Sequence, residues 1–142
     1  MRMAIIKLQN QPIDVAAYYK QLKDPAYGGI VTFCGTIREW TGDIHTTQIA
    51  YTAYEEMAIK EMEKLAAEVE NQGSKVILVH RLGTLEVEDE AVFIGVAAPH
   101  RKAAFEGCQF IIDHLKERVP IWKKEIDTDG IRWGGSQNET IN

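Results

Sequence analysis

The sequence is poor in cysteine, and this scarcity argues against two kinds of small protein. Only Cys34 and Cys108 are present, far apart and with no Cys-x-x-Cys spacing. The sequence therefore predicts neither a zinc site nor a disulfide framework. Free thiols are typical of a reducing compartment, so we expect a cytoplasmic protein.

Long apolar segments and an excess of positive charge are also missing. The apolar run within MRMAIIKLQN at the N-terminus is too short for a signal peptide, and no other stretch approaches membrane-spanning length. Lys and Arg number 16 against 21 Asp and Glu, which gives a formal net charge of −5. A nucleic-acid binder would present a basic face. We therefore expect neither nucleic acid nor a membrane as a partner.

Linkers are absent from the sequence as well. No internal repeat and no stretch rich in Pro, Gly and Ser divides the 142 residues. A chain of this length can bury a hydrophobic core, and we expect one domain spanning residues 1–142.

The apolar pattern predicts an α+β fold with a mixed or antiparallel sheet. Runs of apolar and β-branched residues predict strands at residues 3–8, 30–37, 47–54, 75–81 and 91–98. The strand at 30–37 is expected to be buried, and those at 75–81 and 91–98 to be neighbours in one sheet. Residues 39–46 are expected to form a mobile loop.

Helical spacing of apolar residues predicts one short helix and two long ones. The short helix follows the N-cap candidate Asp14 and ends near Leu22, and the long helices cover residues 55–70 and 101–118. The apolar face of the last helix is expected to comprise Ala104, Phe105, Cys108, Ile111, Ile112 and Leu115. An edge strand at 121–126, a turn at Asp129-Gly130 and a return strand at 131–133 form a small C-terminal β element.

The segment HLKERVPIWKKE, residues 114–125, combines a helix end with a cluster of lysines. Lys116 falls at the border between core and solvent, and Trp122 is expected to anchor Lys123 and Lys124. Lys123 should point away from Trp122, because side chains alternate along a strand. A lysine against an apolar wall can have a lowered pKa and act as acid, base or nucleophile. The alternative is a set of solvated lysines on a helix border and an exposed edge.

Two further places in the sequence suit an anion. His100 and Arg101 stand where a strand gives way to the last long helix, and a helix start attracts anions; capping and a surface ion pair are the alternative. Arg38 follows the 30–37 strand at the mouth of a glycine-containing loop. Arg101 and Lys116 are 15 positions apart on one helix, about 22 Å along its axis. A site shared across a symmetric dimer would allow both to contact one small molecule.

The remaining reactive side chains favour structural roles. Cys34 is expected to be a small buried thiol, since no basic partner lies nearby in sequence to lower its pKa. Cys108 falls on the apolar face of the last long helix and is expected in the core. His80 is expected to be structural, and the four histidines show no metal-ligand spacing.

Four segments together carry a family resemblance. GGIVTFCGTIR (28–38), YTAYEEMA (51–58), HRLGTLEVEDEAVFIGVAAPHRKAAFEGCQFIIDHLK (80–116) and VPIWKKE (119–125), followed by Trp133, resemble the large, catalytic subunits of molybdopterin synthase. The resemblance covers residues 28–133 in the right order and spacing. It implies an α/β-hammerhead-like fold.

The resemblance also implies an enzyme of molybdenum-cofactor biosynthesis that needs no metal or other cofactor. Such an enzyme transfers sulfur from the C-terminal Gly-Gly thiocarboxylate of a small ubiquitin-like sulfur-carrier subunit to cyclic pyranopterin monophosphate. The product is the dithiolene of molybdopterin. Two large subunits are implied as a central homodimer with one small subunit at each end, a heterotetramer.

Residue by residue, the family's two key lysines fall on Lys116 and Lys123. They are implied as general acid/base groups, or one amine as a transient covalent nucleophile. The positions implied to bind substrate are Thr36, Ile37, Arg38, His100, Arg101, Lys124 and Glu125. Of these, His100 and Arg101 are expected from the opposite subunit.

Two features depart from the family pattern. Thr52 stands where many relatives carry an acidic residue. The nine residues after Trp133 contain no Lys or Arg, and Gln137 lies near the place of a basic residue in some relatives. A contact between the tail and the substrate phosphate is therefore in question.

Two other functions remain open from sequence. One is a binding module that docks a ubiquitin-like protein or a phosphorylated pterin without turnover. The other is an acidic α+β domain whose lysines only solvate an edge, which predicts no binding of a Gly-Gly-tailed partner. The presence of both Lys116 and Lys123 favours the enzyme.

Overall fold

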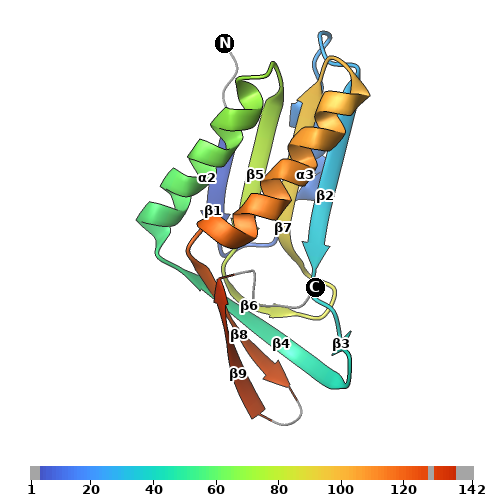
Figure 1. Ribbon diagram of the computed structural model, residues 1–142. Coiled ribbons are helices and arrows are strands. Elements are labelled where there is room, and N and C mark those ends of the chain that lie inside the picture. The colour runs from blue at the N-terminus through green and yellow to red at the C-terminus, as the bar shows by residue number, and fades with distance from the viewer. Residues whose placement is uncertain (1–3, 128–129, 137–142) are drawn as a thin grey trace.

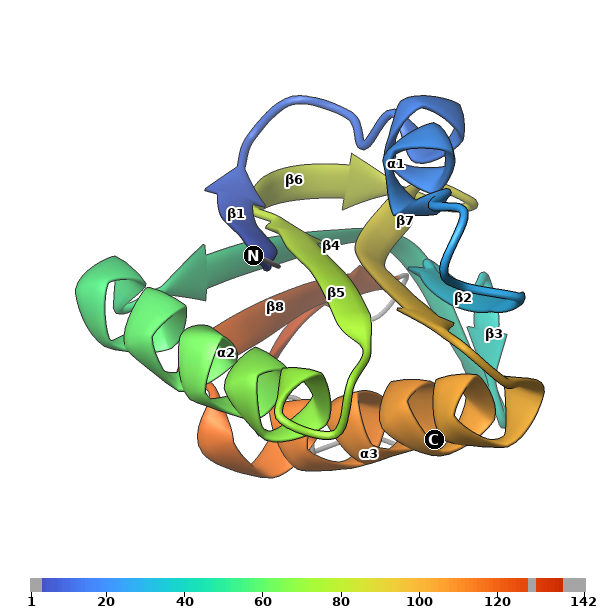
Figure 2. The same ribbon diagram turned by 90° about the horizontal axis from the view of Figure 1, so that it is seen from above.

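The computed structural model describes residues 4–127 and 130–136. A first sheet has the strand order β1 (Ile5–Gln9), β5 (Lys75–Arg81), β7 (Glu90–Ala98) and β2 (Gly29–Thr36). β1 runs parallel to β5, whereas β7 is antiparallel to both β5 and β2. The long helices α2 (Glu55–Glu70) and α3 (Arg101–Arg118) lie on one face of this sheet, and α1 (Val15–Leu22) lies on the other (Figures 1 and 2). The predicted α+β class with two long helices is confirmed.

The two central strands are apolar throughout because both of their faces are covered. On β5, Val76 and Leu78 point to the core under α2 and α3, whereas Ile77 and Val79 point to the core under α1. The same alternation continues on β7, where Phe93 joins the α1 side. Strands buried on two faces read as continuous apolar runs rather than alternating ones. β5 pairs directly with β7, so the predicted pairing of these two strands is confirmed.

The helix ends follow local chemistry. The Asp14 carboxylate accepts a hydrogen bond from the Ala17 N–H at 3.1 Å and caps α1, as predicted. α3 ends at Arg118, just before Pro120, because a proline disfavours helical backbone at the residue before it. The prediction that Phe105 belongs to the apolar face of α3 is wrong. Phe105 is 61% exposed, since it lies on the outer side of the helix.

Strand β2 is less buried than its sequence predicts. Thr32 and Phe33 are exposed, and Phe33 retains 39% of its accessible surface. The reason is its position, because β2 pairs only with β7 and forms an edge of the first sheet. A β-rich run does not by itself distinguish an edge from a centre.

A second, five-stranded sheet closes the lower end of the molecule in Figure 1. Its long central strand is β4 (Ile44–Ala53), flanked by β6 (Gly83–Glu86) and by β8 (Ile121–Asp127), and β9 (Gly130–Ser136) follows β8. The predicted mobile loop at 39–46 is instead a hairpin, in which β3 (Trp40–Thr41) turns back onto β4 with Gly42 at φ +60. The predicted edge position of β8 is also wrong, since β8 lies between β4 and β9. The predicted turn residue Asp129 lies outside the described residues.

His80 on β5 is fully buried, and its burial makes the fold sensitive to acid. Desolvation lowers the pKa of His80 from 6.5 to about 4, although its hydrogen bond to the Arg81 carbonyl opposes the shift. The folded chain therefore keeps this imidazole neutral at pH values where the unfolded chain protonates it. Folding stability that is present above pH 6.5 is lost as the pH falls towards 4.

We expect His80→Leu to remove much of this acid sensitivity. Between pH 7 and pH 4.5 the native chain should lose about 2 kcal/mol of unfolding free energy through this group, at about 1.4 kcal/mol per pKa unit. Urea unfolding at the two pH values measures the difference for each protein. The substitution also changes packing and removes the hydrogen bond to the Arg81 carbonyl at both pH values, so the comparison rests on the change between pH values. An equal loss in both proteins would contradict the assignment.

Candidate active site

The inner face of the second sheet carries an ion pair. Lys123 lies opposite Tyr51, and Glu125 lies opposite Ile49, in the antiparallel pairing of β8 with β4. These four side chains share one face, because alternate residues on a strand point the same way. The Lys123 Nζ is 3.5 Å from the Glu125 Oε2, and each side chain is only 13% exposed. The site therefore begins with a charged pair that is largely withdrawn from water.

The second oxygen of Glu125 is also held. The hydroxyl of Thr46, a residue that is 1% exposed, donates to the Glu125 Oε1 at 3.5 Å. Burial and the nearby Glu125 raise the pKa of Tyr51 to about 12, so its phenol stays protonated. The carboxylate is thus oriented from β4 on one side and from Lys123 on the other.

Lys123 has a lowered pKa, mainly because its burial disfavours the ammonium form. Glu125 raises this pKa through charge and hydrogen bonding, and Arg38 and Lys116 lower it further through their positive charge. Arg38 and Lys116 are therefore close enough to Lys123 to act on it. Both predicted key lysines and the predicted arginine lie in one cluster, which we call the Lys123 cluster (Arg38, Lys116, Lys123 and Glu125).

Three elements bring the Lys123 cluster together. Lys116 comes from the last turn of α3, Lys123 and Glu125 from β8, and Arg38 from the segment after β2. Ile37 fixes that segment, because its N–H donates to the Asp89 carbonyl and its own carbonyl accepts from the Glu88 N–H. Ile37 is buried, whereas Thr36 is exposed at the end of β2. The predicted residues Thr36 and Ile37 thus lead directly into the cluster.

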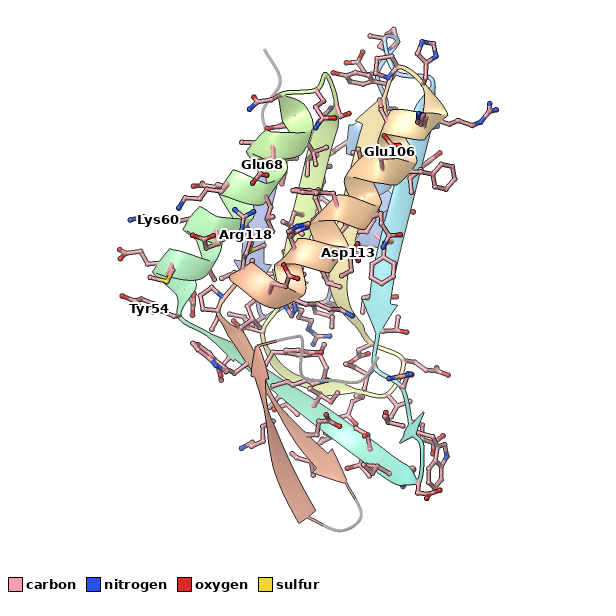
Figure 3. The ribbon with its side chains drawn as sticks, viewed as in Figure 1. Tyr54, Lys60, Glu68, Glu106, Asp113 and Arg118 are labelled. Atoms are coloured by element: carbon pink, nitrogen blue, oxygen red, sulfur yellow. The ribbon has the colours of Figure 1, made fainter. Side chains whose placement is uncertain are left out.

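Two basic residues from the same segment lie elsewhere. Lys124 lies on the outer face of β8 with Trp122, as alternation predicted. Trp122 remains 39% exposed, so the expectation that it anchors the lysines is wrong; the inner face of the sheet holds Lys123 instead. Arg118 contacts Glu61 and Glu68 of α2, its Nη1 3.0 Å from the Glu68 Oε2, and thereby joins the two helices (Figure 3).

The predicted anion residues His100 and Arg101 stand at the opposite end of α3 from Lys116. His100 occupies the N-cap position without a side-chain capping bond, and both residues are exposed. A close approach between β2 and α3 places them there: a Cβ on Gly29 would lie 2.9 Å from the Arg101 Cα. Because α3 is unbroken from Arg101 to Arg118, its length separates these residues from Lys116 by about 22 Å. One chain alone does not bring them into the Lys123 cluster.

Neither thiol resembles a nucleophile. Burial raises the pKa of Cys108 to about 11, and Cys108 lies in the core, as predicted. Cys34 is half-buried on β2 rather than fully buried, and desolvation with the nearby Glu90 raises the pKa of its thiol. Thiolates are the reactive form, so both positions disfavour thiol chemistry.

Sequence reasoning missed Thr46 and Tyr51, which line the Lys123 cluster from β4. Their signal was the cross-strand register, and a single sequence does not reveal which residues of 47–54 oppose Lys123. Among the described residues, no group of three or more His, Cys, Asp and Glu side chains could hold a metal ion. No described helix is long and apolar enough to cross a membrane.

We expect Glu125→Gln to lower the pKa of Lys123 further, because the substitution removes the charge that stabilises the ammonium. The measurement is the pH titration of the Lys123 side-chain ε-carbon by NMR in lysine-labelled protein. Lys123→Gln identifies the signal by its disappearance. A Lys123 midpoint that stays in place or rises in Glu125→Gln would contradict the ion pair described above.

Comparisons with known proteins agree along the length of the chain. A family model described as "MoaE protein" matches residues 8–118. The molybdopterin synthase catalytic subunit of Bacillus subtilis is 41% identical over 140 residues, which are 97% of this chain and 89% of that protein. The crystal structure of molybdopterin synthase from Staphylococcus aureus has 38% identity and a TM-score of 0.86, covering 90% of this chain and 95% of that one.

A further solved structure shares the fold at lower identity. It is a complex of subunits 1 and 2 of molybdopterin-converting factor from Helicobacter pylori, with 19% identity, a TM-score of 0.78 and coverage of 95% of this chain and 92% of that chain. The family model ends at Arg118, whereas the Bacillus subtilis relative extends the match over nearly the whole chain, Lys123 and Glu125 included. On this identity and coverage, the chain belongs to the MoaE family, the catalytic subunits of molybdopterin synthase.

Proposed function

We propose that this chain transfers sulfur from a protein thiocarboxylate to cyclic pyranopterin monophosphate, and so forms the dithiolene of molybdopterin. The observation that carries the proposal is the Lys123 cluster, in which a buried lysine with a lowered pKa lies beside two further cations and one carboxylate. Enzyme sites commonly contain such perturbed groups. The positive charges of the Lys123 cluster suit a reaction between two anionic molecules.

The positive charge of the cluster serves binding. A thiocarboxylate and a cyclic phosphate repel one another, and Arg38 and Lys116 supply charge that offsets this repulsion. A guanidinium also matches the oxygen geometry of a phosphate with paired N–H donors. We therefore assign Arg38 to the phosphate and Lys116 to charge stabilisation during sulfur attack.

Lys123 is assigned the proton transfers. Its lowered pKa provides more free amine near neutral pH than an exposed lysine has, and Glu125 orients that amine. In each transfer, the thiocarboxylate sulfur bonds to a side-chain carbon of the pterin while a C–O bond at that carbon breaks, and a thioester forms. In one transfer the oxygen leaves with the phosphate as its ring opens, and in the other it leaves as water. Water then releases the partner as a carboxylate and leaves the sulfur on the pterin. Lys123 accepts a proton from that water in this assignment.

The sulfur donor is proposed to be a small ubiquitin-like subunit with a C-terminal Gly-Gly thiocarboxylate. The Helicobacter pylori complex of subunits 1 and 2 supports such a partner, since a chain of that complex shares the fold described here. A Gly-Gly tail carries no side chains, so its backbone can approach the strands and the helix end of the Lys123 cluster closely. The reaction is proposed for the cytoplasm, in keeping with the two free cysteines.

The site is proposed to be completed by a second copy of the chain. His100 and Arg101 are exposed at the end of α3 remote from Lys116, so they bind substrate only in the site of a partner. A two-fold axis that crosses α3 would make two equal sites. One small subunit at each site gives the proposed heterotetramer.

We expect Lys116→Ala and Lys123→Ala each to reduce molybdopterin formation by at least about a hundredfold, the usual range for loss of an acid/base group. Purified chain is mixed with thiocarboxylated small subunit and cyclic pyranopterin monophosphate, and the product is measured. Lys60→Ala is the matched control, because Lys60 is exposed on α2 and points to solvent (Figure 3). Native chain that binds both partner and substrate without making product would identify a binding module instead.

A second prediction concerns the shared site. Arg101→Ala and Lys123→Ala chains should each be inactive alone, yet regain activity when refolded together. In an equal mixture half of the dimers are hybrids, and each hybrid has one intact site, so about a quarter of the native activity is expected. Absence of recovery, with hybrid dimers demonstrated by differential tagging, would show that both residues serve the same site of one chain.

A further inference from the structure

Tyr51 lies directly across the strand pair from the lysine that the proposed reaction uses. It is the cross-strand partner of Lys123 in the pairing of β4 with β8, and the two side chains share the inner face of the sheet. Directly opposed residues on one face have Cβ atoms about 5 Å apart, so the ring and the lysine stem are in reach of each other. Tyr51 itself is only 7% exposed.

The ring of Tyr51 is braced from the first sheet. Its centroid is 4.9 Å from that of His80, with an interplanar angle of 72°, an edge-to-face contact. His80 cannot move easily, because it is fully buried and its Nδ1 hydrogen-bonds to the Arg81 carbonyl at 2.8 Å. The contact links the two sheets at the point where Lys123 lies.

We propose that Tyr51 is a positioning residue for the sulfur transfer, whose ring, braced by His80, keeps water from Lys123 and holds the amine beside Glu125. The proposal rests on the function assigned to Lys123 above. In this proposal Tyr51 acts through Lys123 and does not contact the substrate. The feature that matters is the aromatic ring rather than its hydroxyl.

Burial is the largest influence on the pKa of Lys123. A ring that covers Lys123 therefore affects how readily its amine gains and loses a proton. The charged groups that act on Lys123 are Glu125 on the same strand, Arg38 after β2 and Lys116 on α3. Glu125 raises the pKa of Lys123, whereas Arg38 and Lys116 lower it in the same direction as burial, and burial is the largest of these effects. On β4, the residue directly opposite Lys123 is Tyr51.

Substitution of Tyr51 has different effects if the residue only packs in the core and if it also keeps water from Lys123. Tyr51 belongs to the main hydrophobic cluster, and its loss would destabilise the chain in either case. Loss of stability alone leaves the titration of Lys123 unchanged in a folded protein. Loss of a ring that excludes water would hydrate Lys123 and return its pKa towards the ordinary value. The Lys123 titration therefore separates the two roles.

The test compares variants of the full chain by NMR titration of Lys123. Tyr51→Phe keeps the ring, and Tyr51→Thr suits a strand but opens the space to water. Val79→Ala is the matched control, since it weakens the core on the α1 side of the first sheet, away from Lys123. Thermal unfolding confirms that each variant is folded during the titration.

We expect Tyr51→Thr to raise the Lys123 midpoint towards 10.5, with Tyr51→Phe and Val79→Ala close to native. Should Tyr51→Thr fail to fold, Tyr51→Leu replaces it and is expected to give a smaller rise. An unmoved midpoint in the folded Thr or Leu variant overturns the proposal, as does a rise in Tyr51→Phe equal to that in Tyr51→Thr. Because the titration needs neither partner nor substrate, its result does not depend on whether the sulfur transfer itself is correct.

Discussion

The removal of Lys123 from water is the constraint on which the site depends. An ammonium on the inner face of a sheet is unfavourable unless a carboxylate accompanies it, and Glu125 fills that need two positions along the same strand. Glu125 in turn requires a donor for its second oxygen, which Thr46 supplies from β4. The central position of β8, bonded to β4 and β9, follows the same requirement, because an edge strand would leave the pair open to solvent.

The first sheet and its helices serve mainly to deliver side chains to that pair. α3 brings Lys116 by ending at the second sheet, and β2 brings Arg38 by ending beside it. The buried runs of β5 and β7 hold these elements at fixed separation, since close-packed cores resist changes of even one methylene. Precision at the site is thus a product of packing some distance from it.

Local signals in the sequence were sufficient for the helices and for the class of fold. The bounds of α2 and α3 follow from apolar spacing, and Asp14 marks the start of α1. Non-local pairing was not available in the same way. Trp122 and Phe105 are residue types that are usually buried, yet both are exposed here. The outward face of β8 exposes Trp122, and the orientation of α3 exposes Phe105. Tyr51 and Thr46 escaped notice for a related reason, because their importance exists only in the register between β4 and β8.

That register also explains the order of residues in Lys123-Lys124-Glu125. Side chains on a strand alternate strictly, so a slip of one residue in β8 would turn every one of them to the opposite face. Lys124 would then point inward and preserve a lysine in the site, but Glu125 would point out and leave that lysine without its carboxylate. The second lysine therefore does not make this strand tolerant of an insertion or deletion. The position of Glu125 fixes the register of the strand as much as the position of the lysine does.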